Sequence, residues 1–199
     1  MKKVLAFFGA FNPPTTAHLE LADFAWKATG REGVVFVPSR AAYIRGFQQK
    51  DGAYGDAVRL EMLETLAKTR PWMRVCGWEL AQETQPRSYV TLCHLREEGY
   101  EPSLLVGSDN LKVFSGWKYV PEIAREFGIV CLDRGPDSCR EIIENDPVLK
   151  ELSRYIETPE TPAEWRYVSS TAVRSRIRGG GSAEERFRAL PPEIRRLAE

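Results

Sequence analysis

A segment near the start of the chain has the residue types of a phosphate-binding turn. It covers residues 9–18, with the sequence GAFNPPTTAH, between a predicted buried strand and a helix predicted to begin at Thr16. A glycine lets backbone approach a ligand closely, and the N–H groups at a helix start attract phosphate. His18 lies inside the first turn of that helix, near enough to reach the same phosphate. A lone histidine is more often structural, but this position favours a catalytic role.

Two later segments have related chemistry. Residues 107–110 (GSDN) follow another predicted strand, and residues 169–174 (SSTAVR) open another predicted helix. In the latter segment, Ser170 and Thr171 offer hydroxyl groups and Arg174 follows one turn later on the same face. These groups can cradle a phosphate, although an ordinary helix cap beside a solvated arginine would have the same residue types.

Short apolar strands alternate with helices along the chain. Strands are predicted over residues 3–8, 34–37, 73–76, 103–106, 128–132 and 167–168. Helices are predicted over residues 16–27, 55–68, 88–98 and 170–177, with a last helix after Pro191-Pro192. The alternation predicts an α/β fold, a Rossmann-like open parallel sheet with helices on both faces. Ligands of such sheets bind at the carboxyl ends of the strands, where the three polar segments should lie.

The remaining stretches look less regular. A long polar loop is predicted over residues 38–54, and residues 133–162 are the least regular part of the chain. We expect one domain over residues 1–199, with a small helical C-terminal subdomain from about residue 170.

Composition excludes several classes of protein. The 28 Lys and Arg residues balance 28 Asp and Glu residues, which argues against a duplex-DNA binder. The apolar runs have strand length, so neither a membrane span nor a signal peptide is predicted and a cytoplasmic location is expected. The four cysteines are far apart in sequence, which predicts free thiols without a zinc site or disulfides.

Two familiar phosphate-binding motifs are missing. The sequence contains no G-x-x-x-x-G-K-[ST], and no G-x-G-x-x-G follows the first strand. Their absence argues against a P-loop NTPase and against a dehydrogenase with the usual dinucleotide fingerprint.

The first and third polar segments resemble the two signatures of the nucleotidylyltransferase superfamily. The first reads G-A-F-N-P-x-T-x-x-H from Gly9 to His18, and the second reads S-S-T-x-x-R up to Arg174. Within the superfamily, the chain is most similar to the nicotinamide/nicotinate mononucleotide adenylyltransferase family. Trp78-Glu79, the Gly107-Ser108-Asp109 end of a strand, Trp117 and Ala42-Tyr43-x-Arg45 support this resemblance, which covers nearly the whole chain.

The match mixes features of different branches of that family. Asn12 and Thr15 are similar to the eukaryotic type, whereas many bacterial members have aspartate and histidine there. Ser88-Tyr89 is similar to the bacterial type, but Val90 stands where those proteins usually have threonine. The choice between the amide and the acid form of the pyridine therefore stays open, as does the oligomeric state, with which a homo-oligomer is compatible.

The resemblance implies an enzyme of NAD biosynthesis. It would transfer AMP from ATP to a pyridine mononucleotide and release pyrophosphate, with Mg²⁺ on the phosphates rather than on dedicated protein ligands. Neither nucleic acid nor membrane would be a partner. The implied catalytic residues are His18 and Arg174. The implied ATP-binding residues are Gly9, Ala10, Phe11, His18, Gly107, Asp109, Ser170, Thr171 and Arg174. The implied substrate-binding residues are Arg45 for the phosphate and Trp78 and Trp117 for the pyridine ring, with Arg134 a weaker candidate for a phosphate contact.

Two other functions remain open at this point. One is a related transferase that acts on another phosphorylated acceptor, such as phosphopantetheine. The other is a non-catalytic nucleotide sensor that has kept the fold.

Overall fold

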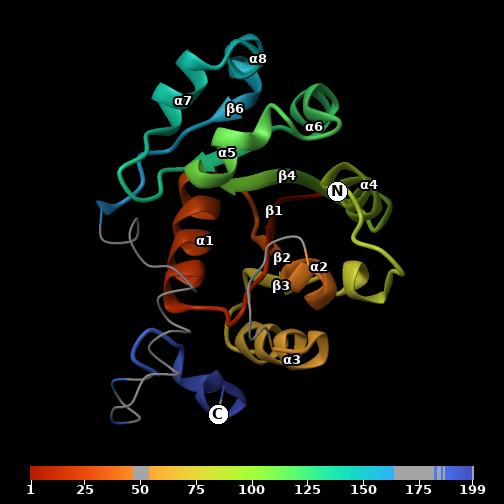
Figure 1. The fold of residues 1–199 in the computed structure, drawn as a ribbon, viewed down its shortest axis with the longest axis vertical. Helices are drawn as coiled ribbons and strands as arrows, with labels where there is room; N and C mark the ends of the chain where they lie inside the picture. The colour runs from red at the N-terminus through yellow and green to blue at the C-terminus, as the bar shows by residue number, and fades with distance from the viewer. Residues whose placement is uncertain (47–53, 164–181, 183–184, 186, 199) are drawn as a thin grey trace. The chain divides into compact units, whose positions relative to one another are not determined.

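The computed structural model describes residues 1–46, 54–163, 182, 185 and 187–198 (Figure 1). Within these residues, six strands form one sheet in the order β3-β2-β1-β4-β5-β6. The strands are β1 (Lys2–Gly9), β2 (Val34–Pro38), β3 (Met73–Val75), β4 (Tyr100–Gly107), β5 (Ile129–Leu132) and β6 (Ile156–Glu157). The pairs β1/β4, β4/β5 and β5/β6 are parallel. This confirms the predicted Rossmann-like parallel sheet.

The strand order changes direction between β1 and β4. These two strands pair up to Phe7 opposite Leu105, and each ends shortly after, at Gly9 and Gly107. In open α/β sheets, ligands bind beyond the carboxyl ends of the strands at such a change of direction. The first two polar segments of the sequence follow the carboxyl ends of β1 and β4.

Helices connect the strands. They are α1 (Thr16–Ala28), α2 (Ala41–Gly46), α3 (Asp56–Ala67), α4 (Ser88–Glu97), α5 (Ser108–Phe114), α6 (Val120–Phe127), α7 (Cys139–Asn145) and α8 (Pro147–Glu151). Three short 3₁₀ helices among the described residues are η1 (Trp78–Ala81), η2 (Ser153–Tyr155) and η4 (Pro192–Ala198). The last of these occupies the place of the helix predicted after Pro191.

The chain forms two compact units, each built from several stretches. The first unit contains Met1–Phe7, Leu21–Val35 and Pro86–Tyr167, and the second contains Phe8–Glu20, Phe36–Gln85 and Val168–Glu199.

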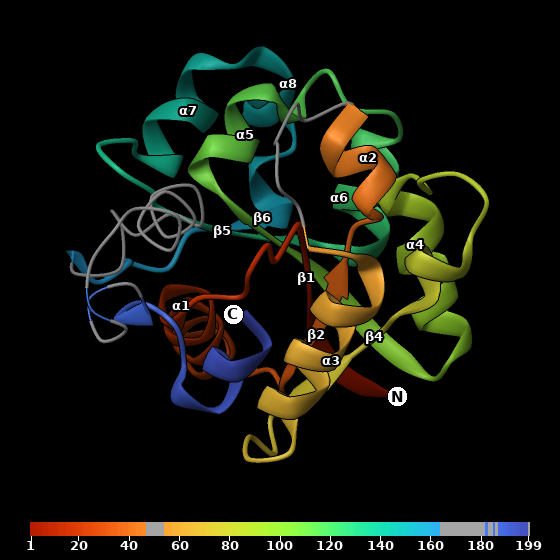
Figure 2. The ribbon, with the colours of Figure 1, turned by 60° about the horizontal axis from the view of Figure 1, so that its bottom comes forward.

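The core of the first unit lies around β4 and β5. All four residues of β5 are buried, as are Leu104 and Leu105 of β4. The helices α4 and α6 lie together against one side of β4, and the second half of α1 lies on the other side (Figures 1 and 2). In α6 the buried residues Val120, Ile123 and Phe127 recur at helical spacing, which gives the helix an apolar face toward β4.

The core of the second unit joins β2, α2 and α3. Its buried side chains include Phe36 of β2 and Ile44 of α2. From α3 it includes Met62, Leu63 and Leu66, and η4 packs against this helix. These elements support the loop that follows β1.

Two expectations about irregular segments were wrong. The predicted polar loop 38–54 contains α2, and the stretch 133–162 contains α7, α8 and β6. Each missed helix in the second stretch has a local start signal: Ser138 accepts a hydrogen bond from the Glu141 amide, and Asp146 accepts from the amides after Pro147. The helices are short, so their apolar periodicity is too brief to recognise. The strand predicted at 167–168 and the helix at 170–177 lie outside the described residues.

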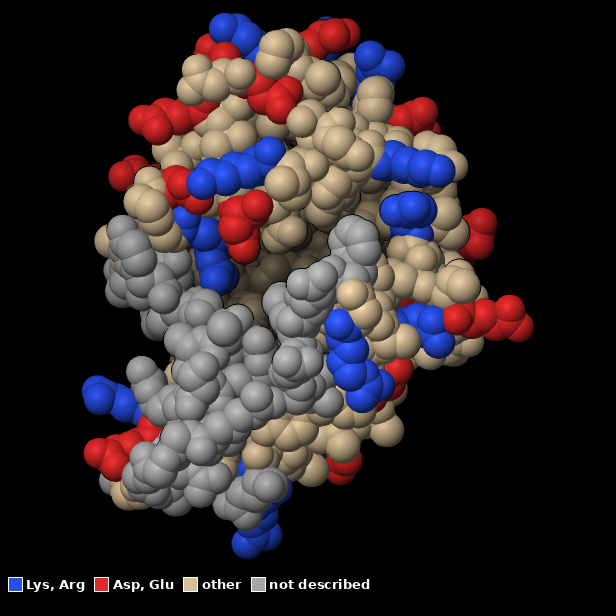
Figure 3. Space-filling view, in the orientation of Figure 1, with Lys and Arg blue, Asp and Glu red and all other residues tan. Residues whose placement is uncertain are grey.

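Other features bear on the predicted class of protein. No helix among the described residues is long and apolar enough to cross a membrane. None of the four cysteines, all of which are described, forms a disulfide, as predicted. On the face shown in Figure 3, acidic and basic side chains of the described residues are interspersed.

The end of α4 gives a test of backbone strain. Gly99 has a φ of +91°, and a Cβ there would meet nothing within 4 Å. Gly99→Ala should therefore lower the free energy of unfolding by about 1 kcal/mol through backbone strain alone. Urea denaturation measures this value. Gly46→Ala is the control: its Cβ would also meet nothing within 4 Å, but Gly46 has no such φ, so the free energy of unfolding should not fall. An equal fall in both variants would contradict the explanation.

Candidate active site

The loop between β1 and α1 has a compact, unusual backbone. Phe11 has a φ of +40°, and the peptide bond between Asn12 and Pro13 is cis. The Phe11 ring is buried against Phe36, with 5.2 Å between ring centroids. A Cβ on Gly9 would lie 3.0 Å from the same ring. A side chain at position 9 would therefore press against this ring, and because the ring is buried, it is the main chain of Phe11 that is available to a ligand.

His18 is held by the residue that precedes its helix. Its Nδ1 accepts a hydrogen bond from the Thr15 amide at 3.0 Å, and the Thr15 hydroxyl lies 2.8 Å from the same nitrogen. An amide N–H can only donate, so Nδ1 carries no proton in this arrangement. In the neutral ring the proton must then reside on Nε2. The loop thus presents His18 as a hydrogen-bond donor through Nε2.

The N–H groups at the start of α1 have a different role from the one expected. The Thr15 amide donates to His18, while the Thr16 amide and hydroxyl both donate to the Ala189 carbonyl at 3.0 and 3.2 Å. These donors therefore bind the protein itself rather than a phosphate. The Ala189 carbonyl of the C-terminal segment thus accepts hydrogen bonds at the start of α1.

A buried arginine that the sequence analysis did not identify supports this loop. The Arg59 side chain is fully buried in the second unit. It donates to the carbonyls of Ala10 and Ser39, each at 2.6 Å, and to that of Tyr54 at 3.3 Å. It also contacts the carboxylate of Asp56. Burial lowers the pKa of Arg59, and the hydrogen bond to Asp56 opposes that shift.

The position of Arg59 could have been found from the sequence. In α3 it precedes Met62, Leu63 and Leu66 at spacings of three, four and seven. These spacings put it on the apolar face, where an arginine has to be paired.

In the first unit, the end of β4 brings together the second polar segment and Arg134. A Cβ on Gly107 would lie 2.5 Å from Oδ1 of Asp109 and 2.7 Å from Cγ of Arg134. The buried Ser108 hydroxyl accepts from the Arg134 amide at 2.7 Å and donates to its carbonyl at 3.2 Å. Gly107 therefore makes room for an acidic and a basic side chain, and Ser108 fixes the backbone of the basic one.

The predicted substrate-binding residues differ in burial and in the elements that carry them. Trp117 is half-buried beside Phe114, with 5.0 Å between ring centroids, and follows α5. Trp78 is half-buried at the first residue of η1, and Arg45 is exposed in the last turn of α2. Ser170, Thr171 and Arg174 lie outside the described residues.

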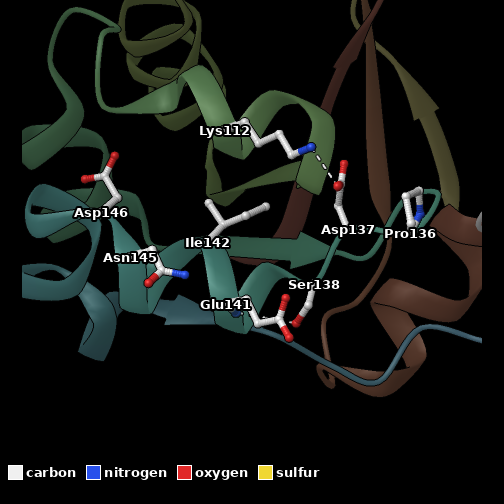
Figure 4. Close-up of a pocket in the computed structure, with 8 residues that line it drawn as sticks. All are labelled: Lys112, Pro136, Asp137, Ser138, Glu141, Ile142, Asn145 and Asp146. Carbon is white, nitrogen blue, oxygen red and sulfur yellow. Dashed lines mark hydrogen bonds and ion pairs between the residues drawn. The ribbon is translucent and has the colours of Figure 1, made fainter.

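A pocket of about 380 Å³ in the first unit stands apart from these residues (Figure 4). Lys112 of α5 and Asp137 form an ion pair of 2.6 Å at its edge. Glu141, Ile142 and Asn145 of α7 line it. None of the predicted site residues lines this pocket, so it does not belong to the candidate active site.

Known proteins similar to this chain share one activity in their names. The nicotinamide/nicotinic acid mononucleotide adenylyltransferase of Arabidopsis thaliana is 26% identical over 196 residues, covering 91% of this chain and 82% of the relative. A probable nicotinate-nucleotide adenylyltransferase of Salinibacter ruber is 30% identical over 189 residues, covering 94% and 89%.

A solved structure supports the fold. It is the nicotinic acid mononucleotide adenylyltransferase of Plasmodium falciparum complexed with NaAD, at a TM-score of 0.77 and 15% identity, covering 99% of this chain and 94% of that one. The family model described as cytidylyltransferase-like matches residues 6–176, which include both signatures. From this match and the near full-length relatives, we conclude that the chain belongs to the cytidylyltransferase-like family.

Proposed function

We propose that this enzyme transfers the AMP group of ATP to nicotinate or nicotinamide mononucleotide, giving the pyridine dinucleotide and pyrophosphate. The names of the Arabidopsis and Salinibacter relatives support this reaction. The Plasmodium falciparum protein has been solved in complex with APC and with NaAD, which is consistent with this reaction. The observation that carries the proposal is the Thr15–His18 hydrogen bond, which presents a donor at the end of β1.

The proposed reaction needs little acid–base chemistry. A phosphate oxygen of the mononucleotide attacks the α-phosphorus of ATP in line, forming one P–O bond while the bond to the pyrophosphate oxygen breaks. That phosphate is already ionised near neutral pH, so no general base is required. Catalysis then depends on positioning and on stabilising charge at the α-phosphate. His18 would donate from Nε2 to an α-phosphate oxygen, and its bond grows stronger as charge develops.

Other residues would hold the two substrates. The main chain of Gly9, Ala10 and Phe11 would lie along ATP. Asp109 would accept from a ribose hydroxyl, and Arg45 would bind the phosphate of the mononucleotide. Further ATP contacts are proposed for Gly107 and for three residues beyond the described part of the chain, Ser170, Thr171 and Arg174, with Arg174 also catalytic. Trp78 and Trp117 would stack on the pyridine ring. Arg134, whose side chain lies beside Asp109, would be a second phosphate contact.

Magnesium fits this arrangement as an ion carried by ATP. Among the described residues, no cluster of three acidic side chains gathers near the end of β1 or β4. Oxygen ligands would come from the phosphates and water, a mode of binding that Mg²⁺ favours. When bound, the ion would neutralise phosphate charge during transfer.

Pyrophosphate release tests the proposal directly. The full chain is incubated with ATP and Mg²⁺, in parallel with nicotinate mononucleotide, nicotinamide mononucleotide and phosphopantetheine. Release with either pyridine nucleotide is expected, and the ratio of the two kcat/KM values gives the pyridine preference. Release with phosphopantetheine alone would replace the proposed substrate, and ATP binding without any release would indicate a sensor.

His18→Ala should reduce kcat by roughly 10²- to 10³-fold, since the donor to the α-phosphate is lost. The chain has only one other histidine, His94, which lies in α4 with its Nε2 3.4 Å from Glu98. His94→Ala is the matched control and should keep kcat. Circular dichroism should show both variants folded. A His18→Ala enzyme with a near-normal kcat would refute the catalytic role.

Trp117→Ala should raise the KM for the pyridine mononucleotide by about fivefold and leave the KM for ATP nearly unchanged. Stacking on a flat ring contributes about 1 kcal/mol beyond burial. Steady-state kinetics with each substrate varied in turn measures both values. Equal increases in the two KM values would argue against stacking on the pyridine.

Gly107→Ala should raise the KM for ATP by roughly tenfold, because the new methyl group displaces Asp109 and Arg134. Gly116→Ala, just beyond α5, is the control. Its Cβ would meet nothing closer than 3.5 Å, so its KM for ATP should equal that of the wild type. If the two variants bind ATP equally well, the end of β4 does not contact the nucleotide.

A further inference from the structure

Arg59 connects three separate segments of the second unit through their main-chain carbonyls. Ala10 belongs to the loop after β1, Ser39 follows β2, and Tyr54 precedes α3. The Tyr54 amide in turn donates to Oδ1 of Asn12 at 2.9 Å. One buried side chain thus fixes the proposed ATP loop to both ends of the stretch that holds α2.

Asp56 extends this network to α2 itself. Its Oδ1 contacts the Arg59 guanidinium and also accepts the amide of Ala41, the first residue of α2, at 2.6 Å. The same helix carries Arg45 in its last turn. The pair of Arg59 and Asp56 therefore sets the position of the helix that presents Arg45.

This arrangement requires a guanidinium. Its N–H donors spread across a plane, so one group can reach carbonyls on different sides at once. A lysine ammonium offers its donors from a single atom and cannot span the same acceptors. Because the group is fully buried, each lost contact leaves a carbonyl or a charge without compensation.

We propose that Arg59 is a positioning residue for adenylyl transfer. Its guanidinium holds the Ala10 main chain in a fixed relation to the helix that carries Arg45. The attacking phosphate of the mononucleotide and the α-phosphate of ATP are thereby held in the relative position that in-line attack needs. This inference rests on the proposed function, in which these two elements bind the two substrates.

Arg59→Lys keeps the positive charge and removes the planar set of N–H donors. We expect kcat to fall at least tenfold at saturating substrate, and both KM values to rise together, because a small misplacement of reacting groups is costly. The control is Met62→Ala, on the same buried face of α3, which removes packing without touching the carbonyls. It should lower the melting temperature and leave kcat within about twofold of the wild type. Kinetics are measured well below both melting temperatures.

Arg59→Lys with wild-type kcat and KM would overturn the inference, whatever its melting temperature. A Met62→Ala enzyme with the same kinetic loss would overturn it too, because stability alone would then explain the effect. Should Arg59→Lys fail to fold, Asp56→Asn replaces it: this side chain is 35% exposed, and its loss of charge should lower kcat several-fold. Unchanged kinetics in Asp56→Asn would then overturn the inference.

Failure of the proposed function would be recognised separately. In that case the wild-type chain releases no pyrophosphate with either pyridine nucleotide. The inference is then tested by equilibrium titration with ATP, where Arg59→Lys should bind at least fivefold more weakly than Met62→Ala. Equal affinities would overturn the positioning role.

Discussion

The catalytic role proposed for His18 depends on the hydrogen bond from the Thr15 amide to its Nδ1. A backbone amide cannot reverse its direction of donation, so this bond selects the ring tautomer that carries its proton on Nε2. The same loop contains the turn in which Phe11 has a positive φ and packs its ring against Gly9. The residue types of the loop thus serve to hold one donor at the end of β1.

Buried polar groups keep this loop in place. Arg59 donates to the Ala10 carbonyl, and the Asn12 side chain accepts from the Tyr54 amide. Ala189, from the C-terminal segment, accepts from Thr16 at the start of α1. Such groups are costly to bury unless each is paired, so together they specify one loop conformation. The first unit uses the same principle at the end of β4, where Ser108 pairs with both main-chain polar groups of Arg134.

Much of the fold and part of the candidate site could be predicted from the sequence. The apolar run 34–37 and Gly9 at the end of β1 are local signals, and they identified β2 and the first polar segment. The use of the α1 amides could not be predicted, because Ala189 lies far from Thr16 in the sequence. The close approach of Arg134 to Gly107 likewise arises from packing between β4 and the loop after β5. Arg59 is an intermediate case: its helical spacing is a signal of burial that the sequence analysis did not use, and its acceptors are set by the tertiary fold.

The tautomer of His18 is the most direct test of this account. Nitrogen NMR of the ring in ¹⁵N-labelled protein, with His94→Ala used to assign the signals, distinguishes a protonated from an unprotonated ring nitrogen. The Thr15 hydrogen bond predicts that Nε2 carries the proton and that its signal moves when a non-hydrolysable ATP analogue binds. A ring protonated on Nδ1, or an Nε2 signal indifferent to the nucleotide, would contradict the role given to His18.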